Sequence, residues 1–97
     1  DLEKTAFDQS FKDMSTILFV LNAIDHKPSD ILLDKIERLT ENSSWKYSAL
    51  ELKGFILLND KKFAESKKTF NTIIEMGNAP TTLASRARDM VDFLEGN

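Results

Sequence analysis

The chain holds few residues whose types and spacing could do chemistry. His26 is the only histidine, and Asp25 and Asp30 lie near it in the sequence. Together they could ligate a metal ion. Zinc sites, however, hold three or four ligands on rigid elements, and a surface histidine at a helix end explains the same residues. A Ser-His-Asp nucleophile system would also need His26, and no glycine-framed serine turn is present to expose the serine.

Other catalytic patterns are equally weak. Asp89 and Asp92 are three residues apart on one predicted helix face, where they solvate the surface rather than perform acid–base catalysis. The 3 glycines are isolated, so no glycine-rich loop can hold phosphate. Without cysteine, there are no disulfides and no thiolate metal ligands. We therefore predict no catalytic residues, no metal and no cofactor, and we predict that the chain is not an enzyme.

Composition is that of a soluble helical domain. The 97 residues are enough for one domain, with 41% hydrophobic and 30% charged residues. Only 3 Gly and 2 Pro are present, and no stretch alternates cleanly between β-branched and polar residues, so strands are not expected. The net charge is −3, and no segment has the positive excess that phosphate binding favours. Nucleic acid is therefore not an expected partner.

Apolar residues recur at helical spacing in five stretches, which predicts an all-α fold. The predicted helices span residues 2–25, 30–41, 45–58, 60–76 and 80–95. Short loops make consecutive helices antiparallel. Residues 2–41 therefore form a first helix pair, residues 43–78 a second pair, and residues 80–95 a capping helix. We expect the whole chain, 1–97, to be a single domain.

The helix predicted over residues 45–58 is apolar on two sides. Its two stripes are Trp45, Ala49, Leu52 and Ile56, and Leu50, Gly54 and Leu57. Two stripes predict burial on both sides, so this helix should lie between neighbours. Gly54 costs roughly 1 kcal/mol relative to alanine inside a helix, which favours another helix packing close to its backbone.

Helix ends are predicted from residues that satisfy unpaired backbone groups. Ser29 and Asp60 are expected to cap the second and fourth helices, and Ser43 or Ser44 the third. Gly77 tolerates the left-handed conformation that is common where a helix ends. Pro80 is suited to opening the last helix.

The first predicted helix carries a long apolar stripe. It consists of Phe7, Phe11, Met14, Leu18 and Leu21, followed by Ile24 or Asp25. Residues 17–21 are apolar all round. We expect residues 17–21 to be buried on several sides, unless the helix breaks near residues 13–15 and resumes. The alternative is that part of the surface is an interface with another molecule.

The stretch from Trp45 to Pro80 resembles a tetratricopeptide repeat, a helix-turn-helix unit of 34 residues. The characteristic positions of the repeat fall on Leu50, Gly54, Leu57, Phe63, Ser66, Phe70, Ile73 and Pro80. Lys53 replaces an apolar residue, Ser66 and Ile73 replace alanines, and Pro80 comes two residues late. The stretch is thus similar to one degenerate repeat, and an ordinary helical hairpin is the alternative. If the resemblance holds, the fold is a TPR-like right-handed helical array.

Three segments of the C-terminal half resemble one bacterial family. They are residues 49–58, 62–70 and 79–87, and the last contains the phrase Ala-Pro-x-x-Leu-x-x-Arg-Ala. They are similar to the YfgM-like, tetratricopeptide-repeat-like proteins of the inner membrane. The resemblance implies a single N-terminal membrane anchor, a periplasmic helical domain, and a role near the protein-translocation channel with periplasmic chaperones.

A binding groove follows from the repeat alignment, because the first helix of each pair lines the concave surface of such arrays. The positions that would face the groove are Ser48, Glu51, Phe55 and Asn59. Glu51 and Phe55 stand where carboxylate-clamp domains carry lysine and asparagine, so a clamp for a C-terminal carboxylate is not expected. Phe55 would favour an apolar side chain of the ligand, or it is simply part of the core.

The sequence therefore predicts a non-catalytic protein–protein interaction module that binds proteins or peptides. The alternative function is structural, with the first helix pairing with a copy of itself in a homo-oligomer. The resemblance places the domain at the bacterial inner membrane, on the periplasmic side. The absence of cysteine fits this compartment or a cytoplasmic one. The start at Asp1 suggests a cut-out or processed protein. The resemblance implies a membrane anchor outside the chain, and membrane contact only through that anchor.

Overall fold

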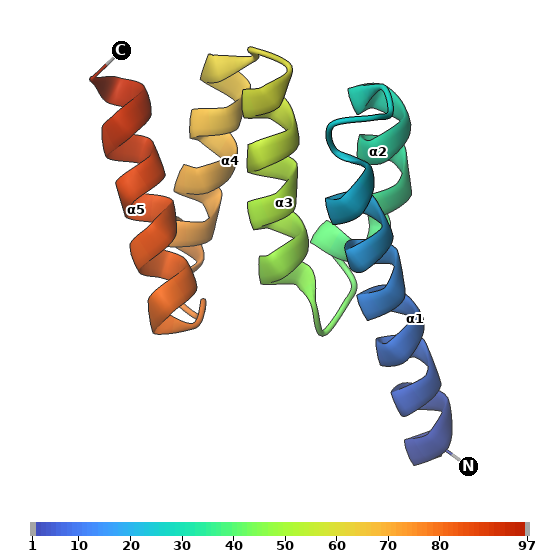
Figure 1. Ribbon diagram of the computed structural model, residues 1–97. Helices are drawn as coiled ribbons and strands as arrows, with labels where there is room; N and C mark the ends of the chain where they lie inside the picture. The colour runs from blue at the N-terminus through green and yellow to red at the C-terminus, as the bar shows by residue number, and fades with distance from the viewer. Residues whose placement is uncertain (1, 97) are drawn as a thin grey trace.

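The computed structural model describes residues 2–96 and is all-α (Figure 1). Its elements are α1 (Leu2–Ala23), α2 (Ser29–Ile36), the 3-10 turn η1 (Arg38–Thr40), α3 (Lys46–Asn59), α4 (Phe63–Met76) and α5 (Thr81–Glu95). No strand occurs within this described range. The predicted fold class, five helices and no sheet, is confirmed, and most predicted helix ends lie within two or three residues of the observed ones.

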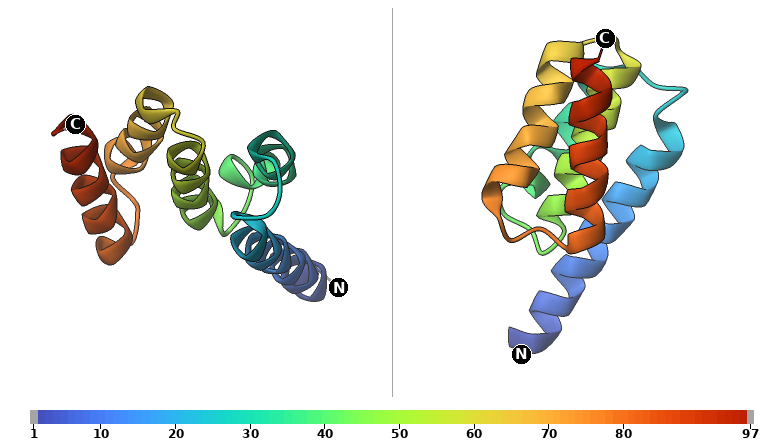
Figure 2. Two further views of the ribbon diagram at one scale, coloured as in Figure 1. Left: turned by 45° about the horizontal axis from the view of Figure 1, so that its top comes forward. Right: turned by 90° about the vertical axis from the view of Figure 1, so that its left-hand side faces the viewer.

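The central helix α3 lies between two apolar clusters, as its two stripes predict. On one side Leu52 and Ile56 pack with a cluster from α1 and α2 that includes Val20, Leu32 and Ile36. On the other side Leu50 joins a cluster from α4 and α5 that contains Phe70, Ile73, Leu83, Ala87 and Val91. The five helices follow one another side by side in a zigzag, and α3 joins the two halves (Figure 2).

Gly54 is the point of closest approach between α3 and α4. A Cβ built on Gly54 would lie 2.5 Å from Cζ of Phe70, a side chain that is fully buried. The Ser66 hydroxyl, from the first turns of α4, donates a 2.8 Å hydrogen bond to the Gly54 carbonyl. The close packing predicted at Gly54 is therefore confirmed. The buried hydroxyl of Ser66 thus has an acceptor inside the domain.

None of the three predicted side-chain caps is found. α3 begins at Lys46 without a side-chain cap, and the Ser43 hydroxyl instead accepts a 3.0 Å hydrogen bond from the backbone N–H of Trp45. Asp60 does not cap α4, which begins at Phe63 without a side-chain cap; its carboxylate instead accepts a 2.9 Å hydrogen bond from the Ser29 hydroxyl. Ser29 is thereby used in a bond between helices rather than as the cap of α2. The left-handed Gly77 (φ 73°) and the opening of α5 at Pro80 are as predicted.

The burial predicted for residues 17–21 of α1 holds only in part, because Val20 is fully buried while Leu18, Phe19 and Leu21 are about half exposed. Phe7, Phe11, Leu18 and Leu21 are 68%, 55%, 49% and 53% exposed. The domain instead packs against a different face of α1, which presents Asp13, Val20 and Ala23. The domain packs on this face because the buried Asp13 forms hydrogen bonds with the segment after α2. These bonds fix the rotation of α1 about its axis. The N-terminal half of α1 also extends beyond the other helices (Figures 1 and 2).

Candidate protein-binding surface

The four predicted groove residues share one face of α3, because their spacing of three or four residues matches the helical repeat. Ser48, Glu51 and Phe55 are half-buried, whereas Asn59 is exposed. The Asn59 amide donates a 3.2 Å hydrogen bond to the carbonyl of Ile24, at the end of α1. Asn59 thus ties the C-terminal ends of α1 and α3 together, in addition to any part in binding.

Glu51 is bound to the neighbouring helix. The guanidinium of Arg86 on α5 donates two hydrogen bonds to its carboxylate, at 2.7 and 3.0 Å. Hydrogen bonding and charge attraction from Glu51 raise the pKa of Arg86 above its ordinary value. A ligand therefore meets a neutralised ion pair at this point, not a free carboxylate.

Phe55 contributes to the core as well as to the surface. Its ring meets that of Phe70 edge to face, with 5.3 Å between centroids and 74° between planes. Such aromatic pairs add about 0.5–1.5 kcal/mol beyond the area they bury. The core alternative for Phe55 is therefore supported in part, because the half-buried side chain packs against the cluster around Leu50 and Phe70. Its binding role stays a prediction.

A shallow groove lies between α2 and α4, and it was not predicted from the sequence. It has a volume of about 570 Å³. Leu50 and Leu57 of α3 form part of its apolar floor, while Glu37, Lys53 and Lys68 are among its charged residues. Its mixture of charges gives no single ligand class, and no sequence motif marks it.

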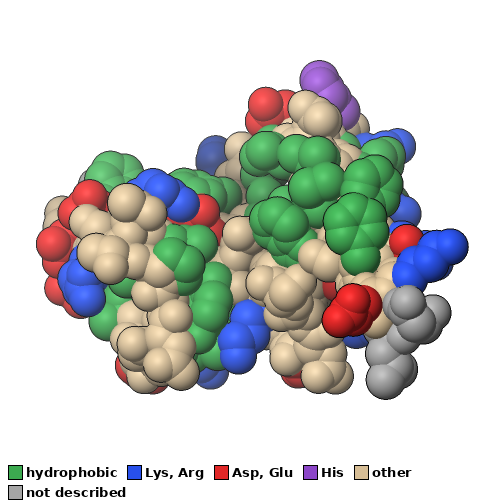
Figure 3. Space-filling view, turned by 90° about the horizontal axis from the view of Figure 1, so that it is seen from below, with side chains coloured by type: hydrophobic (Ala, Val, Ile, Leu, Met, Phe, Trp, Pro, Cys, Tyr) green, Lys and Arg blue, Asp and Glu red, His purple; other side chains and the backbone are tan. Residues whose placement is uncertain are grey.

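The outer face of α1 is the most apolar exposed surface. Hydrophobic side chains gather on the half of the molecule that holds α1 and α2 (Figure 3). Phe7, Phe11, Leu18 and Leu21 belong to it, and the half-buried Met14 lies between them along the helix. In the sequence these residues form one helical stripe, and burial was predicted for its part within residues 17–21. The signal that could have corrected this is their strict spacing of four and three residues, which is narrower than the stripe of a core-facing helix.

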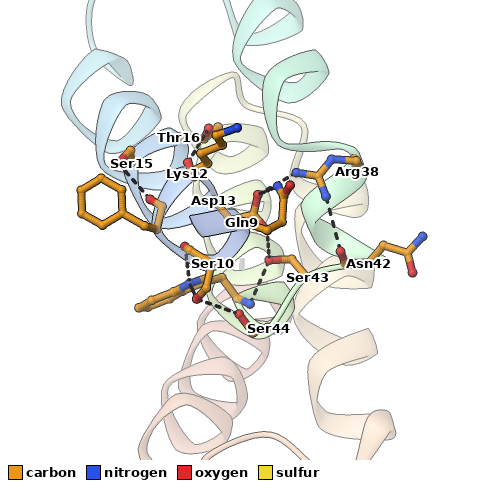
Figure 4. Close-up of polar contacts among 12 residues, drawn as sticks. Gln9, Ser10, Lys12, Asp13, Ser15, Thr16, Arg38, Asn42, Ser43 and Ser44 are labelled. Atoms are coloured by element: carbon orange, nitrogen blue, oxygen red, sulfur yellow. Dashed lines mark hydrogen bonds and ion pairs between the residues drawn. The ribbon is translucent and has the colours of Figure 1, made fainter. Parts of the chain in front are cut away.

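A polar centre holds α1 in this orientation (Figure 4). The carboxylate of Asp13, which is 2% exposed, accepts hydrogen bonds from Arg38 at 2.6 Å, Ser43 at 2.7 Å and Gln9 at 2.8 Å. Burial alone would raise the pKa of Asp13, but the hydrogen bonds from Ser43, Arg38 and Gln9 outweigh it and lower that pKa below 3.8. Every oxygen of Asp13 has a donor, so this centre is structural rather than a ligand site.

The indole of Trp45 adds a second polar contact to α1. Its Nε1–H donates to the Ser10 carbonyl at 3.0 Å, and the same N–H lies 3.0 Å from the Ser10 hydroxyl. These bonds lie one turn before Asp13 on α1. They fix the position of α1 along its axis relative to the rest of the domain. The exposed stripe is therefore held on a rigid element.

The remaining candidate residues do not converge. His26, Asp25 and Asp30 are exposed, and no group of three His, Cys, Asp or Glu residues in the described part of the chain is placed to hold a metal ion. Nor is any helix formed by residues 2–96 both long and apolar enough to cross a membrane.

Comparison with known proteins gives no relative for this chain. No family model matches it, and no curated protein and no solved structure is significantly similar to it.

Proposed function

We propose that this chain is a non-catalytic protein–protein interaction module whose main contact surface is the outer face of α1. The observation that supports this proposal is the exposure of apolar side chains on one face of one helix. Each of them is about half exposed or more: Phe7, Phe11, Leu18 and Leu21. Contiguous exposed apolar surface of this kind marks interaction sites in soluble proteins. The polar contacts of Asp13 and Trp45 hold this face outward, so the exposed face lies on a helix that is fixed to the rest of the domain.

The arrangement of the helices is proposed to be that of a degenerate tetratricopeptide-like array. Three features support it: α1 with α2 and α3 with α4 form successive pairs, α3 packs on both neighbouring pairs, and α5 covers the end. The Ala-Pro-x-x-Leu-x-x-Arg-Ala phrase also has a structural role. Pro80 precedes α5, Leu83 and Ala87 are buried against α4, and Arg86 binds Glu51.

The cellular setting is proposed from the resemblance to the YfgM-like family. In that setting the domain is the soluble part of a membrane-anchored envelope protein on the periplasmic side of the bacterial inner membrane. It acts near protein translocation and chaperones, and its anchor lies outside residues 1–97. A homo-oligomerisation domain is the second candidate function, and the regular apolar face of α1 favours it specifically.

Site-specific photo-crosslinking in the native host tests the proposed function. Benzoylphenylalanine would replace Phe11 on α1, Asn59 on the predicted groove face, and Phe63 at the start of α4. Phe63 is the matched control, because it is an aromatic residue that is 53% exposed, close to the 55% of Phe11. We expect defined protein adducts from position 11 and none from position 63. Absence of adducts from both positions 11 and 59 would contradict a protein-binding function.

A further inference from the structure

The exposed stripe of α1 has the spacing of a coiled-coil seam. Its residues are Phe7, Phe11, Met14, Leu18 and Leu21, with steps of four, three, four and three. This is a strict repeat of 3.5 residues, with Phe11 and Leu18 at a positions and Phe7, Met14 and Leu21 at d positions. We call these five residues the α1 seam. A period of 3.5 residues fits another helix, which packs its own side chains between those of the seam.

The seam is separate from the face that α1 uses within the domain. Val20 and Ala23 are buried against α2 and α3, with Ile17 and Ile24 packed beside them. On a helix of 3.6 residues per turn, the centre of that buried face and the centre of the seam lie on different sides of α1. A second helix can therefore reach the seam without displacing the first.

The size of the seam indicates a reversible contact. From the exposed fractions of its side chains, the seam offers about 400–500 Å² of apolar area. A standard stable interface buries about 800 Å² per partner. The seam alone is therefore suited to a contact that forms in the micromolar range or above.

The charges that flank the seam discriminate between arrangements of two copies. Glu3 occupies a g position, Asp8 an e position and Lys4 an a position. In a parallel pair, Glu3 of one copy would meet Asp8 of the other, and the two Lys4 side chains would face each other. Both contacts join like charges, which disfavours parallel pairing.

An antiparallel pair removes the Glu3–Asp8 and Lys4–Lys4 contacts, and it places one acidic residue, Glu3, as well as Lys4 near Asp25 of the other copy. It brings the N-terminal end of one seam to the C-terminal end of the other, where Asn22 and Asp25 are exposed. Asp8 then lies near the neutral amide of Asn22, and Lys4 lies near the carboxylate of Asp25. The same two contacts occur twice around a two-fold axis near Met14, as in an isologous dimer.

We propose that the α1 seam binds the α1 seam of a second copy of this chain, as an antiparallel two-helix coiled coil. This inference rests on the proposed function, because it names the partner of the same surface. It adds a stoichiometry of two, an orientation and a set of contacts.

Sedimentation equilibrium over a concentration series from about 1 to 500 µM tests the pairing. We expect a reversible monomer–dimer equilibrium for the wild type. Leu18→Glu places a charge at the centre of the seam, twice per dimer, and should raise the dissociation constant at least about tenfold. Phe63→Glu is the control and should leave it unchanged. A dimer that survives Leu18→Glu, or a wild type that stays monomeric throughout, would overturn the proposal.

Spin labels test the orientation. The chain has no cysteine, so a His26→Cys variant carries one label per copy at the end of α1. From the rise of 1.5 Å per residue, antiparallel pairing places the two labels about 30–40 Å apart, and parallel pairing about 10–20 Å. The shorter distance in the dimer would refute the antiparallel arrangement.

Other occupants of the seam give distinct results. A monomeric wild type that binds phosphatidylglycerol vesicles, with binding lost in Leu18→Glu, would show that lipid covers the seam and would overturn the pairing. Adducts from position 11 to a different protein, with none to the chain itself, would also overturn the pairing. That second result would leave the proposed protein-binding function standing, so the two failures are distinguishable.

Discussion

The ring of Phe70 occupies the space in which a side chain on Gly54 would begin. A Cβ on Gly54 would lie 2.5 Å from Cζ and 2.8 Å from Cε1 of this ring. Phe70 is fully buried and is held edge to face by Phe55, so the ring has little room to move away. This contact sets the distance between α3 and α4, and thereby the position of the predicted groove face.

Gly54→Ala should therefore destabilise the domain despite the better helix propensity of alanine. Overpacking costs about 1–3 kcal/mol, and the propensity gain offsets about 1 kcal/mol of this. We expect a net loss of up to about 2 kcal/mol in the free energy of unfolding, measured by urea titration. Phe70→Leu in the same chain should reduce the Gly54→Ala penalty, and a penalty that is the same in both backgrounds would count against the contact.

Leu18 and Val20 are two residues apart on α1, but truncation to alanine should change the free energy of unfolding much more at Val20 than at Leu18. Val20 is fully buried, so Val20→Ala should cost about 1–3 kcal/mol of unfolding free energy. Leu18 is 49% exposed, so Leu18→Ala should change it by no more than about 0.5 kcal/mol. The measurement is urea unfolding at low micromolar concentration, where the proposed dimer is dissociated. A larger loss for Leu18→Ala would mean that the seam faces the core after all.

Asp13 should make stability depend on pH. Its hydrogen bonds with Ser43, Arg38 and Gln9 lower its folded pKa below the unfolded value of 3.8. The resulting stability is present above pH 3.8 and is lost as the pH falls through the folded pKa. Asp13→Asn should cost about 1–3 kcal/mol at pH 7, because it removes the charge that pairs with Arg38 and replaces one acceptor oxygen by an amide donor that faces other donors.

The control for Asp13 is the pH dependence itself. Urea titrations of both proteins should converge as the pH is lowered below 3.8, since the wild-type carboxyl becomes neutral there as well. A difference between wild type and Asp13→Asn that stays constant from pH 7 to pH 3 would show that the charge of Asp13 is not what stabilises α1.

The ion pair between Glu51 and Arg86 separates a structural role from a binding role. Glu51→Arg should lower the thermal unfolding midpoint, and Arg86→Glu in the same chain should restore much of it, because the pair re-forms with its charges exchanged. If Glu51 also recognises a ligand by its charge, the exchanged chain will be stable and yet fail to crosslink from position 59. Full recovery of crosslinking in the exchanged chain would show that the charge of Glu51 does not recognise the ligand.

The fold was predictable where one physical cause dominates. The two apolar stripes of α3 admit only burial on two sides, and Gly54 inside a helix requires a close neighbour; both predictions are confirmed by the positions of Leu52, Leu50 and Phe70. Gly77 likewise has the left-handed conformation expected of a helix end. In each case local chemistry and tertiary packing favour the same structure.

The orientation of α1 was not predictable from hydrophobicity. Its most apolar stripe faces outward, while the buried face includes an aspartate. The hydrogen-bond partners of Asp13 that orient α1 are Arg38 and Ser43, which lie 25 and 30 residues away in the sequence. No local sequence pattern predicts hydrogen bonds at that separation. The caps at Ser29 and Asp60 failed for the same reason, since the two side chains bond to each other across 31 residues.

Hydrogen exchange at two protein concentrations tests the central claim most directly, because it locates the covered surface without any substitution. The N-terminal half of α1 extends beyond the other helices and, alone, should open readily. If the α1 seam binds a second copy, amide protection across residues 5–21 should rise with concentration, while protection in α4 stays constant. Protection of α1 that is identical at about 5 and 500 µM would contradict the account.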